Sequence, residues 1–297
     1  AKPYSAGNLT TNLGLQLVTS PTVNGQVTSA NLVPRSSVQD TYAQILADLT
    51  TAKPLLNDEI GVFASKYAAA AILSRVYLQM GDYAKARDEA NEVIENSGAS
   101  LTTTYVGAFN NADPSSEDIF VLPVTAQDGT NDMWLFWSTG DYGARDGDVE
   151  VNQEHLDLYD PADQRLALFW DVDDIYYSGK YRYQYRFLSQ VRLAEMILTR
   201  AECNEILSTV VGASPVDDFN AIRNRAGLGT VGTVTLDEIL FERHLELAHE
   251  GQRINDIKRL KQSIEGFDYD ANELVLPIPL REINAVGADI LQQNDGY

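Results

Sequence analysis

The stretch ASKYAAAAILSRVYLQMGDYAKARDEANEVI, residues 64–94, decides the fold class. Apolar side chains recur at spacings of three and four over residues 64–80, which predicts an amphipathic helix. The Gly-Asp pair at 81–82 predicts a tight turn, and the helical pattern resumes over residues 83–96. Because the turn is short and alanine is frequent, we expect two antiparallel helices that pack closely.

The same helix pair partly matches the tetratricopeptide pattern. Leu73, Tyr77 and Ala86 stand where that pattern has Leu, Tyr and Ala. Its signature Trp and Gly positions hold Ala70 and Ser74, so the repeat is degenerate. The spacing predicts helical-repeat packing.

Further helices flank this pair. Helical periodicity and terminal signals predict helices over residues 36–52, 189–207, 216–226, 235–251, 252–262 and 279–285. Ser36 and Gln39 form a candidate capping box for the first of these, and Pro54 ends it.

No linker divides the sequence cleanly, so we expect one domain over residues 1–297. Within it we expect four successive parts: a loop over 1–35, helices over 36–100, an irregular insertion over 101–188 and a helical part over 189–297.

The insertion at residues 101–188 is rich in aromatic side chains. It contains all three tryptophans and many tyrosines, among them Trp134, Trp137, Trp170, Tyr142, Tyr159, Tyr176, Tyr177, Tyr181, Tyr183 and Tyr185. Aromatic faces can stack on the apolar C–H faces of sugar rings, and neighbouring polar side chains can bind the hydroxyl groups. The pattern therefore favours a sugar-binding platform.

The candidates for stacking are Trp134, Trp137 and Trp170, followed by Tyr142, Tyr176 and Tyr177. The candidate polar contacts are Asn131, Asp141 and Arg145, with Asp132 and Asp146 nearby. The alternative is that the rings pack the insertion onto the helices. In that case Tyr181, Tyr183 and Tyr185 alternate along an ordinary strand.

Composition excludes several classes of protein. The 297 residues are 44% hydrophobic, which is typical of a globular protein, and the formal net charge is −21. So acidic a surface repels nucleic-acid phosphates and anionic lipid headgroups. No apolar run approaches the roughly 20 residues that a membrane-spanning helix needs.

The sequence assigns no catalytic residue, metal or cofactor. Its 43 acidic residues make neighbouring carboxylates too frequent to be informative. His244 and His249 are five residues apart on one expected helix and therefore on different faces, which argues against zinc. Glu242, Glu246 and Glu250 form a helical stripe. We expect structural ion pairs with neighbouring cations, the candidates being Arg223, Arg225, Arg253, Lys258 and Arg259.

Segments in order along the chain resemble the SusD/RagB family, the glycan-binding outer-membrane lipoproteins of Bacteroidetes nutrient uptake. They are RSSVQDTYAQILADL (35–49), LQMGDYAKA (78–86), EDIF (117–120), VRLAEMILTRAE (191–202), NAIRNRAGL (220–228), ERHLELAHEGQR (242–253), DIKR (256–259), PIP (277–279) and QNDGY (293–297). Asp295 departs from the family's usual Pro. Family members commonly also have an N-terminal helical half and a lipidated cysteine, so we expect this chain to be part of a longer polypeptide.

The resemblance implies a mainly α, tetratricopeptide-like SusD-like fold with a large irregular, partly β insertion. It implies a protein that binds an oligosaccharide or polysaccharide without catalysis at the outer surface of the outer membrane. It further implies delivery to a SusC-like TonB-dependent transporter and membrane attachment only through an N-terminal lipid anchor outside this chain. No binding residue follows from a family motif. A helical-repeat adaptor for a protein or peptide and an acidic glycoside hydrolase remain alternatives.

Overall fold

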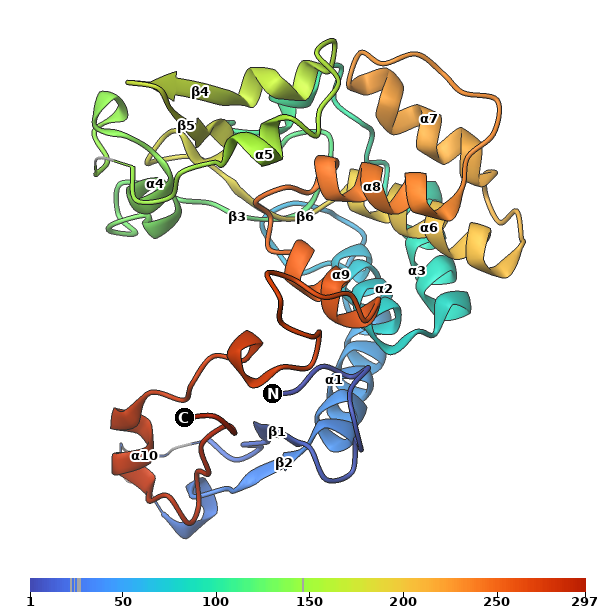
Figure 1. The fold of residues 1–297 in the computed structure, drawn as a ribbon. Coiled ribbons are helices and arrows are strands. Elements are labelled where there is room, and N and C mark those ends of the chain that lie inside the picture. Colours follow the sequence, from blue (N-terminus) through green and yellow to red (C-terminus); the bar gives the residue numbers. More distant parts are fainter. Residues whose placement is uncertain (22, 24, 26–27, 146) are drawn as a thin grey trace. The chain divides into compact units, whose positions relative to one another are not determined.

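The structure is a computed structural model that describes residues 1–297 apart from 22, 24, 26, 27 and 146. Its described residues divide into two compact units (Figure 1). Unit 1 comprises residues 1–48, 79–81 and 254–297, and unit 2 comprises residues 49–78 and 82–253.

Unit 1 is built from short elements. They are β1 (Leu13–Gln16), β2 (Arg35–Ser37), the larger part of α1 (Val38–Ala52), most of α9 (Arg253–Arg259) and α10 (Leu280–Val286). β1 and β2 pair antiparallel with Leu13 opposite Ser37. A Cβ atom at Gly14 would lie 2.2 Å from the Thr41 hydroxyl oxygen and 2.5 Å from the Ser37 carbonyl oxygen. Glycine at this position therefore allows β1 to approach the start of α1.

The cap of α1 differs by one residue from the prediction. Ser37, rather than Ser36, accepts a hydrogen bond from the Asp40 N–H at 3.0 Å, and its hydroxyl donates to the Asp40 carboxylate at 2.7 Å. Ser37 is the last residue of β2 and directly precedes α1, whereas Ser36 lies one residue further from the helix. The structure therefore corrects the predicted Ser36 and Gln39 capping box to Ser37 and Asp40.

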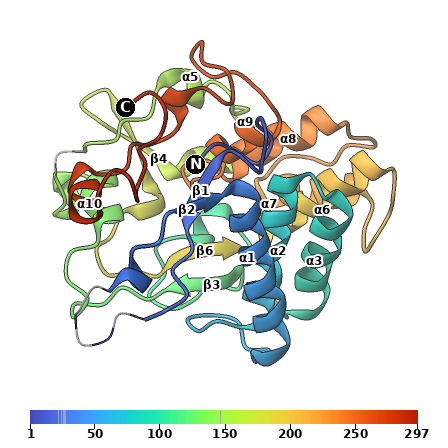
Figure 2. The same cartoon turned by 90° about the horizontal axis from the view of Figure 1, so that it is seen from below.

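Unit 2 holds the longer helices. They are α2 (Lys66–Met80, of which residues 66–78 belong to the unit), α3 (Tyr83–Asn96), α6 (Leu193–Leu207), α7 (Pro215–Arg225) and α8 (Leu236–Glu246). α3 lies against α6, which also contacts α7 and α8 (Figures 1 and 2). The core here contains Ala70 and Ala71 of α2, Ala90 of α3 and Met196 of α6. The small alanine side chains allow the helix backbones to approach closely, as the sequence predicts.

The insertion between α3 and α6 forms short elements. They are β3 (Asp118–Leu122), α4 (Asp132–Trp137), α5 (Gln153–Leu156), β4 (Phe169–Val172), β5 (Ile175–Ser178) and β6 (Leu188–Arg192), joined by loops and 3₁₀ turns. β3 pairs antiparallel with β6, and β4 with β5. The predicted fold class, mainly α with a partly β insertion, is confirmed.

A buried ion network joins the helices of unit 2. Glu246, at the end of α8, pairs with Arg225 of α7 and with Arg192, 3.1 Å away, at the end of β6. Glu117, just before β3, pairs with the same two arginines. All four side chains are at most 3% exposed. The network therefore ties three separate elements to the loop that precedes β3.

The network extends in both directions along the acidic stripe. Glu242 pairs with Arg165 at 2.7 Å, and Glu250 pairs with Arg192 at 2.7 Å and with Lys180 at 2.5 Å. The predicted ion pairs are present, but they use Arg165, Arg192 and Lys180, which the sequence did not single out. Two of the predicted cations, Arg225 and Arg223, also reach the stripe.

Candidate functional site

Helix α4 carries two of the three candidate tryptophans. Asn131 caps the helix, because its side-chain oxygen accepts hydrogen bonds from the N–H groups of Met133 and Trp134. Its amide nitrogen donates to the Gln184 carbonyl at 3.0 Å. Trp134 is 7% exposed, and its indole N–H donates to the Tyr142 carbonyl at 3.2 Å. Asn131 therefore ties the start of α4 to the segment around Gln184, and Trp134 fixes the loop that follows α4.

Trp137 lies half-buried at the end of α4. Its ring centroid is 5.7 Å from that of Tyr181 and 5.1 Å from that of His249. The Tyr181 hydroxyl donates to the His249 carbonyl at 2.9 Å, which fixes this group of rings.

Three partly exposed rings gather around one arginine. The Tyr142 ring lies edge-on to Trp170, with centroids 5.8 Å apart, and edge-on to Tyr183 at 5.5 Å. The Arg182 guanidinium lies 5.2 Å from the Tyr142 ring and 4.6 Å from the Trp170 ring. Tyr142 and Trp170 are half-buried and Tyr183 is 40% exposed. We call Tyr142, Trp170, Tyr183 and Arg182 the ring cluster.

The backbone of Arg182 is held on both sides, which fixes the ring cluster. Its N–H donates to the Asn110 side-chain oxygen at 2.9 Å, and its carbonyl accepts from the Ser138 hydroxyl at 2.9 Å. Edge-on ring contacts and cation–π contacts add to the energy of burial. The cluster is therefore a preorganised aromatic surface.

The β4–β5 hairpin carries Trp170, Tyr176 and Tyr177. Trp170 is opposite Tyr177 in the hairpin, and consecutive side chains of a strand point to opposite faces. Tyr177 is 4% exposed and packs against Gly147, where a Cβ atom would lie 2.2 Å from its ring. Tyr176 is half-buried on the other face. Only Tyr176 of the two tyrosines is therefore open to a ligand.

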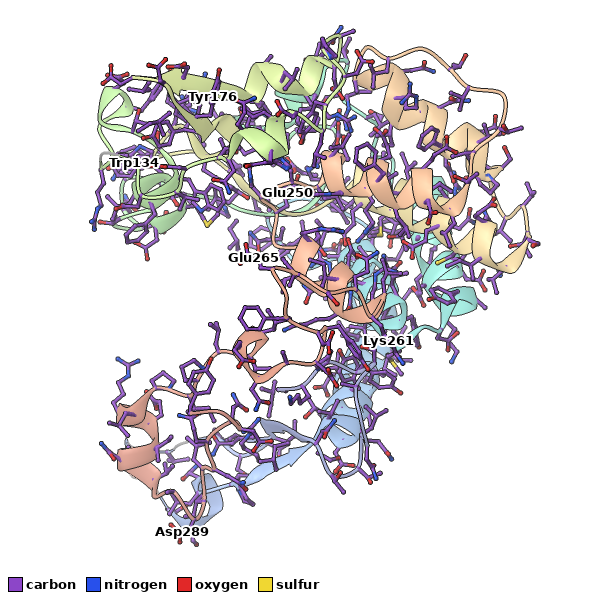
Figure 3. All side chains as sticks on the ribbon, in the orientation of Figure 1. Trp134, Tyr176, Glu250, Lys261, Glu265 and Asp289 are labelled. Carbon is purple, nitrogen blue, oxygen red and sulfur yellow. The ribbon has the colours of Figure 1, made fainter. Side chains whose placement is uncertain are left out.

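Tyr176 lines a cavity of about 610 Å³. Tyr159 and Phe169 contribute two more rings, and Gln153 and Asp157 contribute polar groups. This combination of rings with a few polar groups is typical of small-ligand sites. Figure 3 shows Trp134 and Tyr176 in the insertion of unit 2, with Glu250 of the ion network in the same unit.

The remaining polar candidates lie on the surface. Asp141 is exposed. The Arg145 side chain is 57% exposed, pairs with Asp148 at 2.9 Å and lies 5.3 Å from the Phe136 ring. Asp146 lies outside the described residues. The structure does not bring Asp141 and Arg145 into the lining of the Tyr176 cavity.

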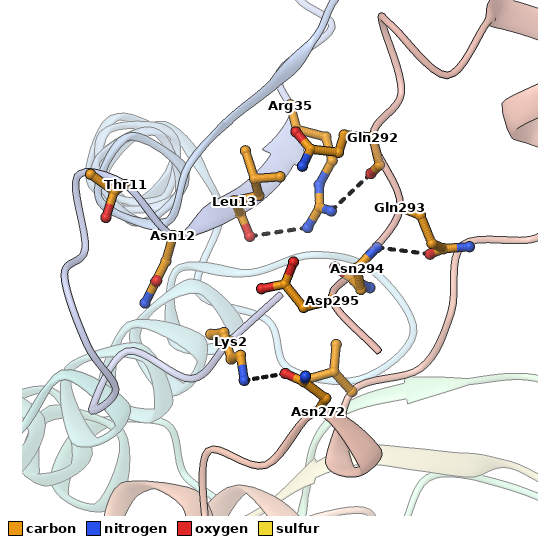
Figure 4. Close-up of a pocket in the computed structure, with 11 residues that line it drawn as sticks. Lys2, Thr11, Asn12, Leu13, Arg35, Asn272, Gln292, Gln293, Asn294 and Asp295 are labelled. Atoms are coloured by element: carbon orange, nitrogen blue, oxygen red, sulfur yellow. Dashed lines mark hydrogen bonds between the residues drawn. The ribbon is translucent and has the colours of Figure 1, made fainter. Parts of the chain in front are cut away.

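Two features of the structure were not found from the sequence. The sequence places Tyr183 among the aromatic residues of the insertion but does not select it as a stacking candidate, and the alternative strand through it is absent, since residues 182–187 form no strand. Unit 1 also contains a polar pocket of about 300 Å³ (Figure 4). Its side chains come from both ends of the chain, so no local pattern could have revealed it.

Comparisons with known proteins agree with the resemblance. The model of the SusD family matches residues 172–275, and a second model, described as starch-binding associating with outer membrane, matches residues 8–78. SusD-like protein P2 of Formosa agariphila is 27% identical over 89% of this chain. A SusD superfamily protein from Bacteroides thetaiotaomicron has the same fold, with a TM-score of 0.79 and 24% identity over 99% of this chain and 73% of its own.

A laminarin-binding SusD-like protein also shares the fold, with a TM-score of 0.76 and 23% identity over 95% of this chain and 74% of its own. The family-model matches and the curated relative support the resemblance to the SusD family, and the solved structures show the same fold. The chain spans 66% of the length of the Formosa agariphila relative, slightly less than two thirds.

No helix in the described part of the chain is long and apolar enough to cross a membrane. Among the same residues, no three His, Cys, Asp or Glu side chains are placed to hold one metal ion.

Proposed function

We propose that the protein binds a glycan on the aromatic surface of its insertion and does no chemistry on it. The observation that carries this proposal is the ring cluster, in which Tyr142, Trp170 and Tyr183 remain partly exposed while Arg182 is anchored between two rings. Sugar rings stack on such surfaces without a conformational change of the protein. The laminarin-binding relative supports a polysaccharide ligand.

Burial narrows the proposed contacts. Trp134 and Tyr177 are 7% and 4% exposed, and the polar atoms of Asn131 bind the backbone. We therefore assign these three residues to packing and keep Tyr142 and Trp170 as stacking residues of the ring cluster. Tyr176, in the cavity on the other face of the hairpin, and Trp137, beside Tyr181 and His249, stay separate stacking candidates. The predictions for Asp141 and Arg145 stay predictions.

We further propose that the whole protein acts at the outer surface of the outer membrane. There it would be held by an N-terminal lipid anchor and would pass its glycan to a SusC-like TonB-dependent transporter. The match of residues 8–78 to a model described as associating with outer membrane supports this location.

The test is calorimetry with laminarin and a panel of other neutral polysaccharides. Trp170→Ala and Tyr142→Ala should each weaken binding about 2- to 10-fold, because a ring contact contributes about 0.5–1.5 kcal/mol beyond burial. Tyr185→Ala is the matched control, since Tyr185 is a tyrosine of the same insertion, is 42% exposed and contacts no described ring. Its affinity should equal that of the wild type.

Two outcomes contradict the proposal. The site assignment is wrong if both ring variants bind as tightly as the wild type. The non-catalytic assignment is wrong if incubation with the bound polysaccharide releases reducing sugar.

A further inference from the structure

The polar pocket of unit 1 differs in chemistry from the aromatic surface of unit 2. It is formed by the N-terminal segment, β1, the start of β2 and the C-terminal segment (Figure 4). Its charged lining residues are Lys2, Arg35 and Asp295, and side-chain amides supply most of the other polar groups. No aromatic ring is among its lining residues, so a ligand here cannot be held by ring stacking.

Lys2 is held in place by neutral oxygen atoms. Its Nζ donates to the Asp270 backbone carbonyl at 2.5 Å and to the Asn272 side-chain oxygen at 2.6 Å. These bonds fix the ammonium group but leave its charge uncompensated. The pKa of Lys258 is lowered, first by burial and then by the positive charge of the nearby Lys2.

Arg35 is held in the same way. Its guanidinium donates to the backbone carbonyls of Leu13 at 3.0 Å, Gly14 at 2.9 Å and Gln292 at 3.1 Å. Among the residues that the structure describes, no carboxylate oxygen lies within 4 Å of Lys2 or Arg35. The buried cations of the ion network in unit 2, in contrast, all contact carboxylates.

Asp295 is the one carboxylate that lines the pocket. Figure 4 shows it between Arg35 and Lys2. It is exposed and accepts no hydrogen bond from any described residue. Two fixed cations against one loosely placed carboxylate leave the lining with a positive charge, although the protein as a whole is strongly acidic.

We propose that this pocket binds an anionic sugar unit, with its carboxylate or sulfate group between Lys2 and Arg35. Hydrogen bonds to charged groups are stronger than those between neutral groups, which favours an anion here. The side-chain amides of Asn12, Asn272 and Gln292 are placed to bind hydroxyl groups of the same sugar. A volume of about 300 Å³ is at the small end of ligand cavities and suits a single sugar ring.

The proposal extends the proposed function to a second site and to acidic glycans. It also gives Asp295 a defined role. An anionic ligand is repelled by the Asp295 carboxylate, whereas the hydroxyl groups of a neutral sugar would use it as an acceptor. Removing the Asp295 charge should therefore strengthen the binding of an anionic ligand and weaken the binding of a neutral sugar.

The test compares galacturonate, galactose 6-sulfate and galactose by calorimetry on the full chain. The first two should bind and galactose should bind at least about tenfold more weakly, because it lacks the charged group. Lys2→Gln should weaken galacturonate binding about tenfold, and Lys2→Arg should restore it. Asp295→Asn should tighten it, and higher ionic strength should weaken it.

Lys261→Gln is the matched control, since Lys261 is an exposed lysine of unit 1 outside the pocket lining. It should bind galacturonate as the wild type does. The proposal is overturned if galactose binds as tightly as galacturonate, if Asp295→Asn weakens galacturonate binding, or if Lys2→Gln has no effect. Trp170→Ala should leave galacturonate binding unchanged, so a failure of the aromatic site and a failure of this pocket give different results.

Discussion

The three histidines of the chain meet at one place in unit 2. The His155 ring centroid lies 5.5 Å from that of His244 and 5.3 Å from that of His249. The sequence places His244 and His249 on different faces of one long helix, but α8 ends at Glu246. His249 lies beyond the helix with a φ of 63°, so the helical period does not apply to it.

His249 makes the stability of unit 2 depend on pH. Burial first, and then the charges of Lys180 and the other two histidines, lower its pKa to about 3, although Glu250 acts in the opposite direction. In the unfolded chain the His249 imidazole takes up a proton near pH 6.5. The stability that the neutral imidazole gives the folded protein is therefore fully present above pH 6.5. It is lost as the pH falls towards 3, by up to about 1.4 kcal/mol per pH unit.

The measurement is urea unfolding between pH 7 and pH 4 for the wild type and His249→Phe. The variant should lose less stability over this range, because phenylalanine keeps a ring against Trp137 and Phe169 but takes up no proton. Equal pH dependence of the two proteins would show that His249 is not the group responsible.

At the scale of elements, the helix pair over residues 64–96 is the part that the sequence predicts best. The second predicted helix matches α3 at both ends, and the first differs from α2 by two residues at its start. Their periodicity is strong, and Asp82 caps α3 through its own side chain. Local sequence is sufficient to predict a helix where both the apolar periodicity and the capping residue belong to that helix.

Prediction fails where distant residues decide the structure. Residues 189–192 continue the apolar pattern of α6, yet they form β6, because β3 pairs with them from about 70 residues earlier in the chain. The same holds for the candidate site. Composition identifies the aromatic insertion, but the hairpin pairing decides that Tyr177 is buried while Tyr176 is open.

Gly147 allows a test of how tightly Tyr177 packs in the insertion. It has a φ of +79°, and a Cβ atom there would lie 2.2 Å from the Tyr177 ring. Gly147→Ala should destabilise the protein by more than the roughly 1 kcal/mol that backbone strain alone costs, because the ring must move. Since Tyr177 packs on Trp170 at 6.0 Å, the variant should also weaken glycan binding.

Gly129→Ala provides the control for backbone strain. Gly129 has a φ of +85°, and a Cβ atom there would meet nothing within 4 Å. Thermal unfolding and calorimetry on both variants separate the two effects. If the two variants unfold at the same temperature, the contact with Tyr177 carries no energy.

At the scale of the whole molecule, the acidic residues behind the net charge of −21 act differently where they are buried and where they are exposed. Some of the acidic residues are buried and form ion pairs with arginine, as Glu117 and Glu246 do. The exposed remainder repels other anions. An anionic ligand therefore needs a local group of cations, which only the unit 1 pocket offers among the cavities described above.

Removing one member of the ion network should be costly. Glu246→Gln leaves Arg192 and Arg225 with less compensating charge in a buried site, where breaking an ion pair costs about 3–5 kcal/mol. Urea unfolding measures this loss. Glu282→Gln is the control, because its pair with Arg281 is exposed and should contribute less than about 1 kcal/mol. Equal stability of the two variants would contradict the assignment.

The network also constrains how this sequence can change over evolution. Each of the two carboxylates, Glu117 and Glu246, pairs with both Arg192 and Arg225. A substitution that removes one of these charges leaves a partner charge buried with less compensation, and a second substitution can remove that partner charge. The two changes together cost less than the sum of each alone. Related sequences should accordingly keep or lose these positions jointly, and residues more than 100 positions apart should covary because they balance the same charge.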